Sequence, residues 1–361
     1  MAGWPIVTPG PRLSRLWWIT GLLLMGLLGA TILVGSRSVP YVVLSPGSAR
    51  SVEPLVEVSQ IEGGPEVTVD EAQDDLLFLT VTATVEPPGF FAAWAWLDDT
   101  FQVEPSAPYL GTQSKDENRA LSLERMTDSQ DKARKVALER LGFEVGTEAV
   151  GAFLEDVDPS YPSAEVLSPG MTVVGIEGEP VTDVDGLVAG ITAKQPGDTL
   201  TLEVVPLAGG DPVEVSTELG RRTDDPSVAA LGVSPVDRVT YEFPVDIAID
   251  SGQVGGPSAG LAFTLAILDR MTPGDLTGPD RVALTGTIEL DGRVGPVGGV
   301  RHKLNAAVDE GAQLFLVPPE EYDEAVEASR DRVEVVSVAT LDEALAALEA
   351  NGGDPLPDPG S

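Results

Sequence analysis

The amino-acid sequence predicts an α+β protein with a single N-terminal transmembrane helix, a small β-rich domain and a larger α/β domain. Three observations predict this class. Residues 16–36 contain no charged side chain, residues 145–220 alternate short apolar runs with Gly/Pro turns, and the chain from residue 238 onward twice follows the order strand, turn, helix. Because 361 residues exceed what one hydrophobic core usually holds, several domains are expected.

The first predicted element is a membrane-spanning helix at residues 16–36, LWWITGLLLMGLLGATILVGS. At ~1.5 Å per residue a helix of this length crosses a ~30 Å hydrocarbon layer. Arg12 and Arg15 precede it, and two tryptophans lie near its start, where interfacial aromatic residues are typical. We therefore expect a single-pass protein of the cell membrane, with residues 1–15 cytoplasmic and the remainder outside the cytoplasm. A cleaved signal peptide is the alternative, although its apolar region is normally shorter.

Composition excludes several kinds of chemistry. The chain has no cysteine, which excludes a thiol nucleophile, a disulfide framework and cysteine-rich zinc sites. Its one histidine, His302, excludes a histidine-rich metal centre and is expected to be an exposed helix residue. The formal net charge of −36 repels nucleic acid and anionic headgroups. No metal, cofactor or nucleic acid is therefore expected.

Residues 38–144 form the first region beyond the membrane helix. The runs 67–69 and 78–85 (FLTVTATV) are rich in β-branched residues and predict strands. Residues 118–141 carry apolar side chains at helical spacing and predict an amphipathic helix, with Thr127 as a candidate cap. The acidic tail 351–361 (NGGDPLPDPGS) is rich in Gly and Pro and is expected to be disordered.

Residues 145–220 form a compact unit. Residues 167–181 read LSPGMTVVGIEGEPV, and a helix at 184–193 and a strand at 198–205 follow. This succession resembles a PDZ domain, which implies that an extended peptide adds to a sheet edge beside a helix. By the same resemblance the carboxylate-binding loop falls on Val150, Gly151, Ala152, Phe153 and Leu154, although the full Gly-Leu-Gly-Phe pattern is absent. A small β-rich spacer is the alternative.

The first motif with catalytic potential is Gly-Gly-Pro-Ser-Ala-Gly at residues 255–260. Residues 239–249 before this motif predict a strand, and the apolar run after it predicts a helix at 258–269, so Ser258 is expected at a helix N-terminus. There the unpaired backbone N–H groups and the helix dipole favour an oxyanion, which makes Ser258 a candidate nucleophile with Gly256, Pro257 and Ala259 as its oxyanion loop. Alternatively, Ser258 only caps the helix.

The second motif is Gly-Gly-Val-Arg-His-Lys at residues 298–303. Serine needs a base to become a nucleophile at neutral pH, and a desolvated lysine is one such base, here Lys303. Thr285, in a predicted strand, is a candidate to orient Lys303, or else an ordinary strand residue.

Taken in order, Gly-Pro-Ser-Ala-Gly, Thr285-Gly286 and Gly298-Gly299 with Lys303 resemble the proteolytic domain of Lon proteases over residues 243–320. The resemblance implies a Lon-type α/β proteolytic domain at 225–350, with Ser258 and Lys303 as a catalytic dyad. It also implies that the region 38–144 supplies the first part of this domain, so that the PDZ-like unit is inserted into it. The family often has acidic residues where this chain has Gly255 and Thr287.

No Walker-type phosphate-binding sequence occurs in the chain, so any proteolysis is expected to be independent of ATP. The layout resembles the membrane-anchored PDZ-Lon proteins of Gram-positive bacteria. It implies a serine endopeptidase that cleaves extracytoplasmic or membrane-associated proteins selected by the PDZ-like unit, and a hexameric ring by resemblance. Two alternatives stay open: a catalytically silent peptide-binding scaffold at the membrane, and hydrolysis of a non-peptide amide.

Overall fold

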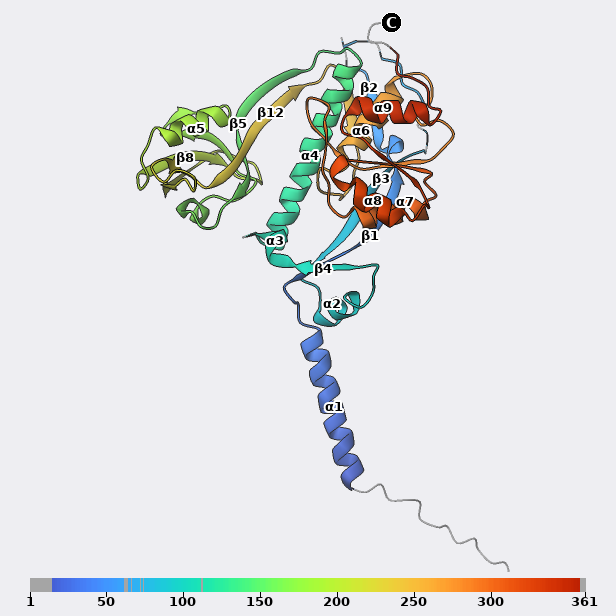
Figure 1. Cartoon of the computed structure of the whole chain (residues 1–361). Coiled ribbons are helices and arrows are strands. Elements are labelled where there is room, and N and C mark those ends of the chain that lie inside the picture. The colour runs from blue at the N-terminus through green and yellow to red at the C-terminus, as the bar shows by residue number, and fades with distance from the viewer. Residues whose placement is uncertain are drawn as a thin grey trace, which may run out of the picture. The chain divides into compact units, whose positions relative to one another are not determined.

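The computed structural model describes residues 15–61, 64, 65, 67–71, 73, 75–111 and 113–357, without the side chains of residues 15 and 16. The chain divides into two compact units (Figure 1). The first comprises Met1–Ser45 and Ala83–Tyr109, and the second comprises Pro46–Thr82 and Leu110–Ser361.

The first unit contains the apolar helix. Helix α1 (Arg15–Gly35) begins and ends one residue before the predicted span. Within the described residues it is the one helix long and apolar enough to cross a membrane, with a mean hydropathy of 2.0 over Trp17–Gly35. The start of strand β1 (Tyr41–Ser51) pairs antiparallel with β4 (Gln102–Pro105). Two short helices complete this part of the chain, α2 (Gly89–Ala95) and α3 (Ser106–Leu110).

One of the two main sheets is mainly parallel and has both faces covered. From one edge its strands run in the order β18 (Glu334–Ser337), β17 (Leu314–Val317), β14 (Val282–Leu284), β3 (Leu76–Val85) and β1, with β18, β17, β14 and β3 parallel to one another. Alternate residues of these strands enter two different hydrophobic cores, as the strand pleat requires: Val282 and Leu284 of β14 lie in one core and Ala283 in the other. Buried parallel strands of this kind explain the nearly continuous apolar runs in the sequence.

Helices from distant parts of the chain build the two cores. One core contains side chains of α4 (Lys115–Arg140), α6 (Gly260–Met271) and α9 (Leu341–Ala350). The other contains side chains of α7 (Val300–Asp309) and α8 (Tyr322–Ser329). Short elements connect them: η1 (Glu53–Leu55), β2 (Val56–Ser59), β13 (Asp246–Ile249), β15 (Thr287–Ile288), β16 (Val294–Gly295) and η3 (Pro319–Glu321).

Helix α4 begins three residues before the predicted helix and has a different cap. Ser114 and Glu117 form a reciprocal capping box at its N-terminus. Thr127, the expected cap, lies in the middle of the helix and donates instead to the carbonyl of Leu123. The helix packs along α6, so the segment before the PDZ-like unit and the segment after it share one core.

The PDZ-like domain has its own sheet and core. The strand order is β12 (Val233–Glu242), β5 (Gly146–Val157), β6 (Thr172–Ile176), β8 (Thr199–Val205) and β9 (Val213–Glu218), with β7 (Glu179–Pro180) paired to β6. Helix α5 (Val184–Thr192) covers the core, and η2 (Pro162–Glu165), β10 (Gly220–Arg221) and β11 (Ala229–Ala230) complete the domain. The predicted α+β class, with its apolar N-terminal helix, PDZ-like domain and α/β domain, is confirmed.

The structure differs from the sequence prediction at the expected carboxylate-binding loop. Residues 150–154 lie inside β5 rather than in a loop, with a shift in register against β12 at Val150. Ala152 and Phe153 are in register with β12 on one side and β6 on the other, so both edges of this segment are paired. The partner strand β12 is a long-range pairing that the local sequence pattern does not reveal.

Three further predictions need correction. Residues 67–69, predicted as a strand, form none. The expected continuous strand from 239 to 249 is divided into the end of β12 and the separate strand β13. In the tail, residues 351–357 are attached to the domain: Asp354 donates its N–H to the carbonyl of Asp275 at 2.7 Å and accepts the N–H of Asp275 at 3.1 Å. Residues 358–361 lie outside the described part of the chain.

Candidate active site

Ser258 lies in the turn between β13 and α6 and is half-buried. The helix starts at Gly260, two residues later than predicted, and its N-cap is Ala259, which has no side-chain capping bond. Ser258 therefore does not serve as a cap, and the capping alternative is excluded. A Cβ atom at Gly260 would come within 2.8 Å of the backbone nitrogen of Ile288, so glycine is required where the helix meets β15.

Four hydrogen bonds fix the backbone of this turn. The N–H of Gly286 (3.0 Å) and the hydroxyl of Thr285 (3.2 Å) both donate to the carbonyl oxygen of Ser258. From α4, the hydroxyl of Ser129 donates to the carbonyl of Pro257 at 2.9 Å, and the carbonyl of Ser122 accepts the N–H of Gly256 at 2.7 Å. The serine is thus held between α4 on one side and the end of β14 on the other.

Fewer residues of the expected oxyanion loop can offer a free N–H group than the sequence suggests. Pro257 has no N–H, and the N–H of Gly256 is already bonded to Ser122. Among the residues that the structure describes, the N–H groups of Ser258 and Ala259 have no hydrogen-bond partner. These two groups, at the N-terminal end of α6, are the ones available to an oxyanion, whereas Gly256, with φ of 88°, shapes the turn.

Lys303 lies in the first turn of α7 and points into the protein. The N-cap of this helix is Gly299, whose φ of 69° and close approach to Val81 both call for glycine. Only 3% of Lys303 is exposed. Burial lowers the pKa of the Lys303 ammonium from 10.5 to about 8, because removal from water disfavours the charged form. At neutral pH, a larger fraction of Lys303 is therefore uncharged than of a lysine on the surface.

Thr285 connects the two candidate catalytic residues. Lys303 Nζ donates to Thr285 Oγ1 at 2.9 Å, and the same hydroxyl donates to the carbonyl of Ser258. Thr285 is fully buried and follows directly after β14, at the carboxyl end of the parallel sheet, where ligands of such sheets commonly bind. No direct bond joins Ser258 Oγ and Lys303 Nζ within the described residues; the structure brings them together through Thr285.

Two ionisable residues near Lys303 were not recognised as site residues from the sequence. Glu321, at the end of η3, raises the pKa of Lys303 electrostatically, which partly opposes the effect of burial. Burial also raises the pKa of Glu321 itself. His302, predicted to be exposed, is only 2% exposed, and burial lowers its pKa. The available signal for Glu321 was its position just after the strand 314–317, at the same sheet edge as Thr285.

The structure gives a steric reason for one departure from the Lon pattern. A Cβ atom at Gly255 would lie 2.5 Å from the hydroxyl of Ser122 on α4. A side chain at position 255 therefore requires the Ser122 hydroxyl to rotate away and α4 to shift slightly. Thr287, the second departure, pairs with Gly295 in the small β15–β16 ladder.

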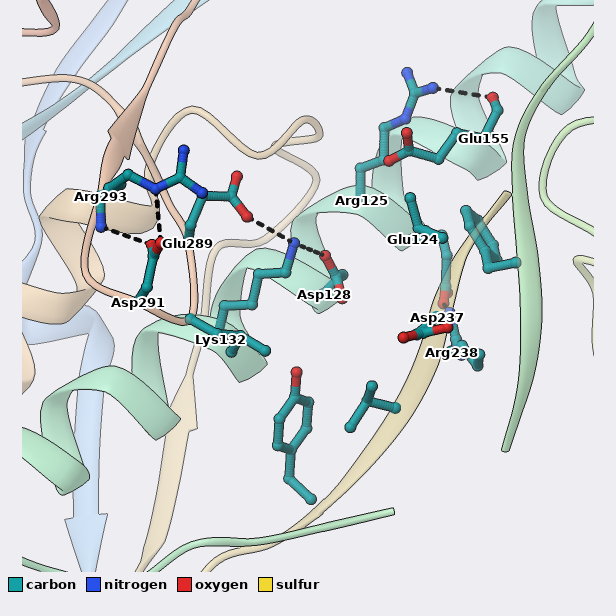
Figure 2. A pocket seen from close by; sticks show the side chains of 15 residues that line it. Glu124, Arg125, Asp128, Lys132, Glu155, Asp237, Arg238, Glu289, Asp291 and Arg293 are labelled. Atoms are coloured by element: carbon teal, nitrogen blue, oxygen red, sulfur yellow. Dashed lines mark hydrogen bonds and ion pairs between the residues drawn. The ribbon is translucent and has the colours of Figure 1, made fainter. Parts of the chain in front are cut away.

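A charged cavity of about 600 Å³ lies beside α4 and is separate from the dyad (Figure 2). Its walls come from α4, the β5 and β12 strands, and the turn between β15 and β16. Figure 2 shows Lys132 between two carboxylates, at 3.1 Å from Asp128 and 3.7 Å from Glu289, and Arg238 pairs with Glu124. Neither Ser258 nor Lys303 lines it. Among the described residues, no group of three or more His, Asp or Glu side chains is arranged to hold a metal ion.

The part of the chain that carries this site is similar to known proteins. Residues 169–350 match the model of the Lon protease (S16) C-terminal proteolytic domain. The chain is 34% identical over 176 residues to a Lon protease of Clostridioides difficile, covering 44% of this chain and 22% of that protein. It is 31% identical over 195 residues to a Lon protease of Chloroflexus aggregans, covering 50% of this chain and 23% of that protein. The chain thus spans about a fifth of the length of these relatives.

Solved structures similar to this chain include the PDZ domain of an SdrC-like protein from Listeria monocytogenes, with 20% identity, a TM-score of 0.22, and coverage of 24% of this chain and 88% of that one. Another is GtR34C from Geobacillus thermodenitrificans, with 25% identity and a TM-score of 0.21. The match covers 23% of this chain and 94% of that one. The family match begins at residue 169, inside the PDZ-like domain and before the predicted start at 225, and runs through both glycine-flanked motifs to the end of α9. On this match over half of its length, the chain belongs to the family of Lon protease (S16) C-terminal proteolytic domains.

Proposed function

We propose that the chain is an ATP-independent, membrane-anchored serine endopeptidase with Ser258 as nucleophile and Lys303 as general base. One observation carries the proposal: a fully buried lysine with a pKa lowered to about 8 is bonded to Thr285, which in turn holds the backbone of Ser258. An ordinary structural lysine would remain charged and solvated. Family membership supports the same chemistry.

The proposed reaction uses only groups of this chain. Neutral Lys303 accepts the hydroxyl proton of Ser258, and the serine oxygen attacks the peptide carbonyl carbon. The free N–H groups of Ser258 and Ala259 stabilise the negative oxygen that forms. The lysine then returns the proton to the leaving amine, and a water molecule hydrolyses the acyl-enzyme by the same path. Thr285 holds the Lys303 amine in position and receives no proton itself.

The proposed setting is the outer side of a membrane. Helix α1 is the anchor, with the N-terminus cytoplasmic and the catalytic domain outside. This orientation follows from the two arginines before the helix and the absence of acidic residues before Glu53. In the proposed domain division the PDZ-like unit, 145–220, is inserted into the Lon-type domain; the shared core of α4 and α6 supports this. Assembly into a hexameric ring is proposed from family resemblance alone.

Selection of protein substrates by the PDZ-like domain is the remaining part of the proposal. Residues 150–154 can take a peptide strand only after β12 or β6 separates from β5, because both edges are paired. The edge strands of this sheet are β12 and β9, and β12 lies against α5 and forms one wall of the charged cavity. Since such domains take a peptide at a sheet edge beside a helix, β12 is the alternative place for peptide addition.

The direct test measures cleavage of unfolded proteins and peptides by the full chain in lipid nanodiscs, without ATP. Ser258→Ala and Lys303→Ala are each expected to abolish cleavage while circular dichroism shows an intact fold. Ser227→Ala and Lys194→Ala change the same residue types in exposed or partly exposed positions of the PDZ-like domain and are expected to retain it. Peptide binding without turnover by the wild type would favour the scaffold alternative. Cleavage that survives Lys303→Ala would remove the lysine from the mechanism.

A further inference from the structure

An exposed aromatic patch lies in the first unit, outside everything that the active site uses. The patch comprises Phe90, Trp94, Trp96 and Leu97, which are 62%, 52%, 77% and 78% exposed. They belong to α2 and the residues directly after it, in the uncharged stretch 87–97 (PPGFFAAWAWL). Scattered single apolar residues are normal on a protein surface, but four large ones within eight positions mark an interaction surface.

The patch has a fixed scaffold beneath it. Ala92 and Ala95 on the other face of α2 are buried. The Trp94 ring stands against Phe101 at 4.9 Å and against Phe91 at 5.9 Å, and Phe91 also contacts Phe101. These contacts orient α2, so the apolar side chains outside it are presented by a packed element.

The patch adjoins the end of the apolar helix α1. The two helices are in contact within the first unit, as Figure 1 shows, and a Cβ atom at Gly35 would lie 3.5 Å from Cβ of Phe90. Just beyond α1, the N–H of Gly89 donates to the carbonyl of Arg37 at 2.9 Å. Residues 36–39 and 87–89 therefore form one tight junction, which places α2 within a few ångströms of the point where α1 ends.

We propose that this aromatic patch lies in the headgroup region of the same lipid bilayer that α1 spans, as a second, monotopic membrane contact. The proposal rests on α1 being a membrane anchor. Tryptophan and phenylalanine concentrate at the membrane–water boundary, because their rings are apolar or amphipathic and fit that depth. The patch meets this boundary because α1 ends there. Acidic residues flank the stretch at Glu86 and Asp98, so the lipid surface that fits is a neutral one rather than an anionic one.

The test uses single-cysteine spin labels, which the absence of native cysteine makes unambiguous. The full chain is placed in phosphatidylcholine nanodiscs with a nitroxide at Leu97→Cys, at Leu23→Cys within α1, or at Val213→Cys, an exposed apolar position of the PDZ-like domain. Power-saturation measurements compare collision with oxygen, which concentrates in lipid, and with a water-soluble nickel chelate. Leu97→Cys is expected to favour oxygen at least threefold more than Val213→Cys, and Leu23→Cys is expected to favour it most.

Three other outcomes of the spin-label measurement would contradict the proposal. If the label at position 97 behaves like the label at position 213 while the label at position 23 reports lipid, the patch does not contact lipid, although α1 still spans the membrane. A label at 23 that reports water overturns the anchor and this inference with it. A label at 97 that is shielded from both reagents and shows spin–spin broadening identifies a second copy of the chain as the occupant, which also overturns the lipid assignment.

A measurement without labels guards against disturbance by the nitroxide. With Trp4, Trp17 and Trp18 changed to phenylalanine, the remaining fluorescence comes from Trp94 and Trp96. Brominated phosphatidylcholine is expected to quench more than half of it, and less than a fifth after Leu97→Lys with Phe90→Lys, two exposed changes that lift the patch toward water. Emission that brominated lipid does not alter in the unmodified patch contradicts the proposal.

Discussion

The lowered pKa of Lys303 predicts how the reactivity of Ser258 depends on pH. Only the neutral amine can accept the serine proton, so the rate of serine modification follows the fraction of neutral Lys303. With a pKa of about 8, roughly one molecule in eleven has the neutral amine at pH 7 and roughly ten in eleven have it at pH 9. The rate is therefore expected to rise about tenfold between these two values and to level off above pH 9.

A serine-directed fluorophosphonate measures this without knowledge of the substrate. The second-order rate of labelling is followed from pH 6 to 10.5 on the full chain in nanodiscs, with Ser258→Ala as the blank. Lys194→Ala changes a surface lysine that pairs with Glu177 and is expected to leave the profile unchanged. Lys303→Ala should reduce the plateau rate at least a hundredfold, the usual contribution of a positioned general base.

Two results would refute the reasoning. A midpoint near 10.5 would mean that Lys303 is as basic as a solvated lysine, contrary to its burial. A rate that does not depend on pH in this range would mean that another group, or none, takes the proton.

Four further predictions follow from the same contacts. Thr285→Val removes the hydroxyl bonded to both Lys303 and Ser258 and should lower the plateau of serine labelling roughly tenfold, whereas Thr285→Ser should retain it. Glu321→Gln removes the charge that raises the pKa of Lys303, so the midpoint of the labelling profile should fall below 8; an upward shift would show that the electrostatic assignment is wrong. Lys303→Met should raise the free energy of unfolding at pH 7 by about 2 kcal/mol. Removing the buried ammonium, whose lowered pKa destabilises the folded state below pH 8, stabilises it by about 3 kcal/mol, and losing the bond to Thr285 destabilises it by about 1 kcal/mol. As pH rises from 8 to 10.5 the wild-type cost is relieved but the lost bond to Thr285 remains, so this gain should turn into a loss of up to about 1 kcal/mol; urea unfolding at both ends checks the sign. Gly260→Ala should destabilise by about 2 kcal/mol because its Cβ meets the Ile288 backbone, whereas Gly298→Ala, with open space around it, should change stability by less than about 0.5 kcal/mol in the same urea titration.

The sequence was most informative where local chemistry determines structure. A run of 21 residues without a charge has few alternatives to an apolar helix, and α1 follows it to within one residue at each end. The apolar periodicity of 118–141 was also sufficient for α4. The two glycine-flanked motifs identified Ser258 and Lys303 as candidates, because only a few kinds of site need glycine, serine and lysine in such an order. Their catalytic roles stay predictions.

The features that the sequence did not predict depend on contacts between residues far apart in the chain. Residues 150–154 were assigned to a loop by the PDZ resemblance, and the strand that pairs with them, β12, lies more than 80 positions later in the chain. His302 was expected to be exposed because it lies next to Lys303 on a helix and points about 100° away from it, yet its side chain is buried too. The aromatic stretch 89–97 gave no periodic signal, since a seven-residue helix is too short for one. Glu321 reaches the lysine only because the parallel strands β14 and β17 end at the same sheet edge.

The ladder between β5 and β12 has a consequence for the modularity of this chain. Gly146 and Glu242 are register partners, so the two ends of the intervening segment lie about 5 Å apart. A gap of that size is closed by a two-residue hairpin turn. The whole segment of nearly a hundred residues can therefore be exchanged for a short turn, or for another domain with adjacent termini, without separating α4 from β13. This junction therefore allows the PDZ-like domain to be replaced in protein engineering while the core that α4 and α6 share keeps its own packing.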